Sequence, residues 1–188
     1  MLNEIVIFAA GAAFVSILAL VRRRFAGFSG QTADDYNEDY PQFDMRAHLD
    51  GAMICEGVIF GPLGRMTSTF VAEFDIVWDG NSCTMKEEFL YNDGSVQHRE
   101  WRIELDGGGS FVAQADDVPG TGKGEMSGPA LLFRYPIKLP ADSGGHILHA
   151  FDCMYLTKSG TIVNRSQFRK FGFKVAELVA TIRRKEEA

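Results

Sequence analysis

The sequence predicts a mainly β protein: a closed, antiparallel up-and-down barrel of about eight to ten strands, preceded by one N-terminal transmembrane helix. Three observations lead to this prediction. The chain opens with an uncharged apolar run, hydrophobic residues then alternate with polar ones, and short glycine-rich turns separate the alternating segments. The 188 residues, with 20 glycines and 15 phenylalanines, suffice for one β domain and an appendage.

Residues 1–24 are expected to form a transmembrane anchor with a basic flank. The run from Ile5 to Val21 contains no charged side chain and would make a helix of about 25 Å, close to what a bilayer requires. A cleaved signal peptide carries positive charge before its apolar run, whereas here Arg22, Arg23 and Arg24 follow it. Cationic flanks remain in the cytoplasm. We therefore expect a single-pass protein of the inner (plasma) membrane with a cytoplasmic soluble domain, the alternative being a periplasmic one.

An acidic linker is expected over residues 25–42, and the barrel domain over residues 43–188. The linker carries four acidic residues, Asp34, Asp35, Glu38 and Asp39. An anionic membrane surface repels such side chains, so the linker should hold the domain away from the bilayer.

Composition argues against several classes of function. The formal net charge of −6 disfavours a nucleic-acid partner. The three cysteines form no CxxC pair, so a zinc or thioredoxin-type site is not expected, and buried thiols are the simplest interpretation. The segment 115–128 resembles a phosphate-binding loop only superficially, because Lys123 is followed by Gly124; a glycine-rich hairpin explains it better. No nucleophile elbow or metal-ligand pair is present, so no catalytic residues and no cofactor are predicted.

The strands are predicted from alternation with a period of two. Segments 70–78, 101–105 and 131–139 each place large apolar residues on one face and polar ones on the other. Short turns such as Asn92-Asp93-Gly94 imply antiparallel neighbours. Residues 174–184 fit either strand or helix, and we predict a closing strand.

Polar residues that face the barrel interior would be the candidate ligand-binding residues. Asp152 stands alone in an otherwise apolar segment, 150–156, and an unpaired buried carboxylate is costly. Arg165, beside Asn164 on the following strand, is its expected partner inside the barrel; a purely structural pairing is the alternative. The predicted ligand-binding set is Asp152, Asn164, Arg165, Arg134 and Tyr135.

Basic residues near the C-terminus predict a surface that contacts lipid head groups. Arg169 and Lys170 are expected at the rim of the barrel, and Arg183 and Arg184 extend the basic character. Together with the arginines at 22–24 they form the predicted membrane-surface set, although a solvated charged end is an equal alternative.

Several segments together resemble domain-of-unknown-function family 3833. They are FDMRAHLDG (43–51), WDGNSCTMKEEFLYNDGSVQHREWRI (78–103), ADDVPGTGKGEMSGPALLFRY (115–135), DCMYL (152–156) and NRSQFRKFGFKVAE (164–177). Residues at the family's recurring positions include Asp116, Asp117, Asn164, Arg165, Lys170, Phe171 and Gly172.

The resemblance implies a lipocalin-like architecture, and relatives are bacterial proteins often described as lipoproteins. Their genes often lie near enzymes that modify membrane fatty acids, which implies lipid handling. This chain departs from the family pattern twice. It has no lipobox cysteine before Cys55, and the family's aspartate pair followed by tryptophan is replaced by Phe151, Asp152 and Cys153.

The leading functional hypothesis is a membrane-anchored, lipocalin-like protein that binds a fatty-acyl or other apolar ligand and assists membrane lipid modification or transfer. Phenylalanine-rich inner faces would hold the chain, and Arg165 with Asp152 or Asn164 would hold its polar end. Membrane lipid is the expected partner. The alternatives are a non-catalytic subunit of a membrane protein complex and an enzyme acting on modified membrane lipids.

Overall fold

The computed structural model describes residues 2–36 and 41–186, apart from the side chains of Leu2, Arg23, Arg24 and Asp142. The chain divides into two compact units, Met1–Asp35 and Tyr36–Ala188.

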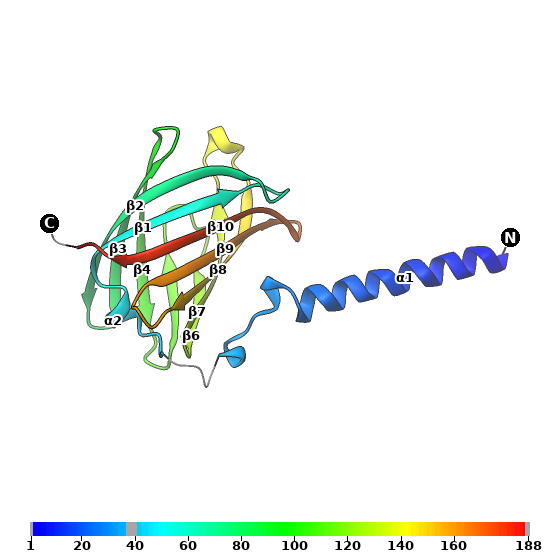
Figure 1. Cartoon of the computed structure of the whole chain (residues 1–188), viewed down its shortest axis with the longest axis horizontal. Coiled ribbons are helices and arrows are strands. Elements are labelled where there is room, and N and C mark those ends of the chain that lie inside the picture. The colour runs from blue at the N-terminus through cyan, green and yellow to red at the C-terminus, as the bar shows by residue number, and fades with distance from the viewer. Residues whose placement is uncertain (1, 37–40, 187–188) are drawn as a thin grey trace. The chain divides into compact units, whose positions relative to one another are not determined.

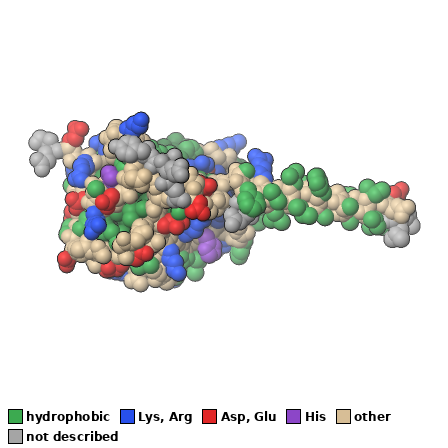
Figure 2. All heavy atoms as spheres, turned by 90° about the horizontal axis from the view of Figure 1, so that it is seen from below, with side chains coloured by type: hydrophobic (Ala, Val, Ile, Leu, Met, Phe, Trp, Pro, Cys, Tyr) green, Lys and Arg blue, Asp and Glu red, His purple; other side chains and the backbone are tan. Residues whose placement is uncertain are grey.

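The first unit is mainly one long helix, α1 (Leu2–Phe25), followed by two short 3-10 turns, η1 (Phe28–Gly30) and η2 (Ala33–Asp35). Apolar side chains run along the helix (Figure 2). The stretch Asn3–Arg22 is long and apolar enough to cross a membrane, and none of it is buried within the structure. The predicted apolar helix is confirmed; by length and composition it suits either a membrane anchor or a signal sequence.

The second unit is a closed barrel of ten antiparallel strands (Figure 1). Each strand pairs with its neighbours in sequence, and β1 pairs with β10 to close the sheet. The predicted up-and-down barrel is therefore confirmed, and residues 174–184 form a strand. The strands are β1 (Gly51–Phe60), β2 (Met66–Asp79), β3 (Ser82–Tyr91), β4 (Val96–Leu105), β5 (Ser110–Gln114), β6 (Gly122–Ser127), β7 (Ala130–Lys138), β8 (Ile147–Leu156), β9 (Ile162–Lys170) and β10 (Phe173–Arg184).

The two ends of the barrel differ. The short helix α2 (Met45–His48) and the residues beside it close one end, where Met45 and Leu49 are buried. Trp78 Nε1 donates a 2.8 Å hydrogen bond to the Leu49 carbonyl, and the Phe43 amide donates one of 2.7 Å to the Gly128 carbonyl. We call this the floor. The antiparallel register places the loops 61–65, 92–95, 115–121, 139–146 and 171–172 together at the opposite end, which we call the mouth.

The glycines of segment 115–128 serve two purposes. Gly120 lies in the turn with φ of 95°, as expected for a glycine-rich hairpin. Gly122 and Gly124 instead lie inside β6, where added Cβ atoms would come within 2.6 Å of Phe133 and 2.1 Å of Phe111. Their missing side chains let aromatic rings lie directly against the strand.

The three cysteines are buried and free, as the sequence predicted. Cys55 and Cys83 belong to the core of the barrel, whereas Cys153 faces outward on β8, opposite in register to Arg165.

Candidate ligand-binding cavity

The barrel encloses a cavity of about 1340 Å³. Met45 and Leu49 line it at the floor, and Lys170 and His146 line it at the mouth. Between these ends the wall is strongly aromatic, because the strands other than β6 contribute alternate residues to the lumen. The aromatic lining residues are Phe70, Phe74, Phe89, Tyr91, Trp101, Phe111, Phe133, Tyr135 and Phe168.

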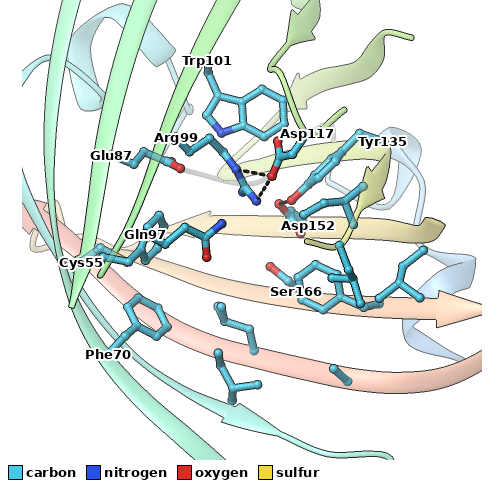
Figure 3. Close-up of a pocket in the computed structure, with 18 of the residues that line it drawn as sticks. Cys55, Phe70, Glu87, Gln97, Arg99, Trp101, Asp117, Tyr135, Asp152 and Ser166 are labelled. Carbon is cyan, nitrogen blue, oxygen red and sulfur yellow. Dashed lines mark hydrogen bonds and ion pairs between the residues drawn. The ribbon is translucent and has the colours of Figure 1, made fainter. Parts of the chain in front are cut away.

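One side of this apolar wall carries ionisable groups, Glu87, Arg99, Asp117, Tyr135 and Asp152, which we call the polar cluster (Figure 3). Arg99 is central to it. Its Nε and Nη2 atoms both donate to Asp117 Oδ2, at 3.0 and 2.6 Å, and only 14% of its side chain is exposed. Glu87 stands directly opposite Arg99 in the β3–β4 register, so both side chains face the lumen.

The second half of the polar cluster centres on Asp152. The hydroxyl of Tyr135 on β7 donates a 3.0 Å hydrogen bond to Asp152 Oδ2 on β8. Ser166 is the register partner of Asp152 on β9, and Asn164 Nδ2 donates to Ser166 Oγ at 3.3 Å. Three neighbouring strands thus present hydroxyl, carboxyl and amide groups to the same part of the lumen.

Burial changes the protonation of the two carboxyl groups that no arginine clamps. Desolvation raises the pKa of Glu87 to about 7, against the opposing effect of Arg99. Desolvation likewise raises the pKa of Asp152 to about 6, although hydrogen bonds from Ser166 and Tyr135 favour its ionised form. Near neutral pH both groups therefore exchange between a neutral carboxyl and an anion.

These shifts predict that the folded protein loses stability as pH rises. The folded state holds the Glu87 proton up to about pH 7, whereas the unfolded chain releases it near the ordinary value of 4.5. Stability should therefore fall between these values, by about 3 kcal/mol for this group. Glu87→Gln should flatten the decline in a series of urea unfolding curves from about pH 5 to about pH 8.

Glu104→Gln is the matched control, because Glu104 is exposed on the outer face of β4. It should leave the pH dependence unchanged. Equal slopes for the wild type and both variants would show that Glu87 does not titrate with a raised pKa.

Three of the predicted ligand-binding residues line the cavity, namely Asp152, Asn164 and Tyr135. The prediction that Arg165 points inward and pairs with Asp152 is wrong. Adjacent residues of a strand face opposite sides, and Asn164 already occupies the inner face. Arg165 lies outside and donates to Glu177 Oε1 at 2.6 Å.

Arg134 also lies on the outer face of the barrel. Its guanidinium carbon is 3.3 Å from the centroid of the Phe151 ring, in a cation–π arrangement between β7 and β8. It therefore has no access to the lumen, because it alternates with the inward-facing Tyr135.

The basic residues predicted to contact a membrane surface do not form one patch. β9 ends at the mouth, where Lys170 lines the opening and Arg169 donates from Nη1 to the Gly172 carbonyl at 3.1 Å. β10 ends at the floor, where Arg184 donates to the Ala47 carbonyl at 3.0 Å and Arg183 lies 3.4 Å from Glu56. Arg22 belongs to α1, and the side chains of Arg23 and Arg24 lie outside the described part.

Adjacent family-motif residues have separate roles. Asp117 holds Arg99 inside the lumen, whereas Asp116 is 97% exposed and lies 3.2 Å from Arg102. Phe171 and Gly172 form the two-residue turn between β9 and β10, with positive φ angles of 49° and 82° that such a turn requires. Phe171 itself is 88% exposed at the mouth.

The sequence prediction missed Glu87 and Arg99, although the alternation of inward and outward residues along their strands indicates that both face the lumen. Arg99 falls in phase with Trp101 and Ile103, and Glu87 falls in phase with Cys83 and Met85. Charged residues in phase with a buried face indicate lumenal groups. Among the described residues, no group of three or more His, Cys, Asp or Glu side chains is placed to hold a metal ion.

A closed antiparallel barrel around an aromatic lumen defines a lipocalin-like β-barrel protein. More particularly, the chain belongs to the family described as protein of unknown function (DUF3833), whose model matches residues 23–184.

Solved structures support the fold class. An S-type phycobiliprotein lyase, CPES, from Guillardia theta superposes with a TM-score of 0.52 and 11% identity, over 76% of this chain and 91% of the lyase. A protein of unknown function from the DUF3598 family of Nostoc punctiforme PCC 73102 gives a TM-score of 0.57 and 14% identity. That match covers 78% of this chain and 51%, about half, of the other. None of the curated proteins compared with this chain matches it in sequence.

Proposed function

We propose that this protein is a membrane-tethered binding protein that holds a largely apolar ligand, such as a fatty-acyl chain, in the lumen of its barrel. The observation that carries the proposal is the cavity of about 1340 Å³ with an aromatic wall and one localised group of polar side chains. Ligand sites of small barrels have this composition: apolar walls supply most of the affinity, and few polar groups orient the ligand. A purely structural domain would fill the same space with side chains.

The tether and its side of the membrane belong to the same proposal. The stretch Asn3–Arg22 would span the inner membrane, and the arginines that follow it favour a cytoplasmic barrel. There the protein would assist modification or transfer of membrane lipids. Reporter fusions at the C-terminus test the orientation: activity of a cytoplasmic reporter is expected, and activity of a periplasmic reporter alone would reverse the assignment.

Fluorescence quenching tests whether an apolar ligand enters the lumen. The chain has two tryptophans. Trp101 lines the cavity, whereas Trp78 donates a hydrogen bond to the Leu49 carbonyl at the floor. A long-chain alcohol with a terminal bromine should quench Trp101 fluorescence in the full-length Trp78→Phe protein. It should leave Trp78 fluorescence unchanged in the Trp101→Phe protein. Equal quenching of both tryptophans, or of neither, would contradict binding in the lumen.

A further inference from the structure

Four buried oxygen atoms among the described residues have no hydrogen-bond partner, and all belong to side chains that line the cavity. They are Glu87 Oε2, Asp117 Oδ1, Asp152 Oδ1 and Asn164 Oδ1. Glu87, Asp152 and Asn164 are each more than nine-tenths buried. Buried polar groups are normally satisfied, and an unsatisfied acceptor costs about 1–3 kcal/mol. Hydrogen-bond donors are therefore missing from this part of the lumen.

The polar cluster also contains more acidic groups than basic ones. It contains three carboxyl groups, from Glu87, Asp117 and Asp152, but a single guanidinium. The Nε and Nη2 atoms of Arg99 both donate to the same acceptor, Asp117 Oδ2. An additional anion beside this cluster would meet three carboxyl groups and one guanidinium that already pairs with Asp117. The predicted arginines Arg134 and Arg165 cannot add positive charge there, because they lie on the outer face.

We propose that the polar end of the ligand is a hydrogen-bond donor, a hydroxyl or amide group, and that the cavity selects against a carboxylate. The proposal deepens the proposed function and rests on it. The donor head would lie beside Asp152, Asn164 and Glu87 and supply the hydrogens that their oxygens lack, with the apolar part along the aromatic wall. A free fatty acid would leave the same oxygens unsatisfied and add a like charge.

Competition binding tests the proposal with ligands that differ only at the head. Full-length protein in nanodiscs is titrated at about pH 8, above the pKa of Glu87 (about 7) and that of Asp152 (about 6). The ligands are hexadecanol, hexadecanamide, hexadecanoate and hexadecane, an alkane without a head group. The alcohol and the amide should bind about tenfold or more tightly than hexadecanoate. Hexadecane should bind less tightly than the alcohol and the amide. Its affinity should lie between theirs and that of hexadecanoate, or below both.

A double variant with Glu87→Gln and Asp152→Asn should show a smaller ratio of hexadecanol affinity to hexadecanoate affinity. It removes both negative charges and adds amide donors. Glu88→Gln, on the outer face of the same strand, should retain it. If hexadecane binds, and hexadecanoate binds as tightly as hexadecanol or more tightly, the inference is overturned while the proposed function stands. Failure of all four ligands to bind would overturn both.

Discussion

Arg99→Met should lower the free energy of unfolding by about 3–5 kcal/mol. The guanidinium is the one cation of the polar cluster, and its removal would leave Asp117, and Glu87 when ionised, without a compensating charge in a low-dielectric lumen. The charged form of an unpaired buried carboxylate is strongly disfavoured, so the folded state would have to protonate it or rearrange. Urea unfolding of the full-length protein, followed by tryptophan fluorescence, measures the loss.

Arg102→Met is the matched control for Arg99. Arg102 lies on the same strand but on the outer face, 52% exposed, within 3.4 Å of Glu100 and 3.2 Å of Asp116. Exposed ion pairs contribute little, so this variant should lose less than about 1 kcal/mol. A double variant that also changes Asp117 to leucine should be more stable than Arg99→Met alone, because the orphaned carboxylate is gone. Equal losses for Arg99→Met and Arg102→Met would contradict a buried role for Arg99.

Gly124→Ala should destabilise the barrel by about 3 kcal/mol, because the added methyl group would overpack a rigid site. A Cβ at this position would lie 2.1 Å from Phe111 Cζ and 2.8 Å from the Leu132 carbonyl oxygen. The phenyl ring can rotate, but the carbonyl belongs to the neighbouring strand β7 and cannot move without breaking the sheet register.

Gly108→Ala is the control for Gly124. It places a Cβ at 3.6 Å from Asp106 Oδ1, an ordinary contact, and keeps the backbone amide that bonds to that oxygen. Its unfolding free energy should stay within about 0.5 kcal/mol of the wild type. Similar thermal and urea stability for Gly124→Ala and the wild type would show that β6 can move away from Phe111.

The barrel was predictable from sequence because its signals are local. Alternation along segments such as 70–78 follows from the two-residue period of a strand, and each glycine-containing turn marks a hairpin. The closing strand was ambiguous because Val175 and Leu178, which are both apolar, are three residues apart, a spacing that fits a helix and breaks strict alternation. A bulge between Lys174 and Ala176 explains this, because it shifts the alternation within β10.

The site was less predictable because it depends on which strands face one another across the lumen. Asp152 and Asn164 could be recognised as polar residues in apolar strands, yet the partner predicted for Asp152 was Arg165, the arginine on the following strand. The actual partner is Tyr135, and the lumenal arginine comes from β4. Strict use of alternation would have placed Arg165 outside and Arg99 inside, but the pairing of Arg99 with Asp117 from a loop needs the three-dimensional fold.

The most direct test of a ligand-holding lumen compares two tryptophan substitutions on neighbouring residues of β10. Leu178 lines the cavity, whereas Val179 is exposed on the outer face. Native mass spectrometry of full-length protein released from nanodiscs should detect a bound apolar molecule in the wild type and in Val179→Trp. In Leu178→Trp, whose indole occupies the lumen, the bound fraction should fall about tenfold or more. An equally low bound fraction in all three proteins, or an equally high one, would contradict the assignment of the lumen as a ligand site.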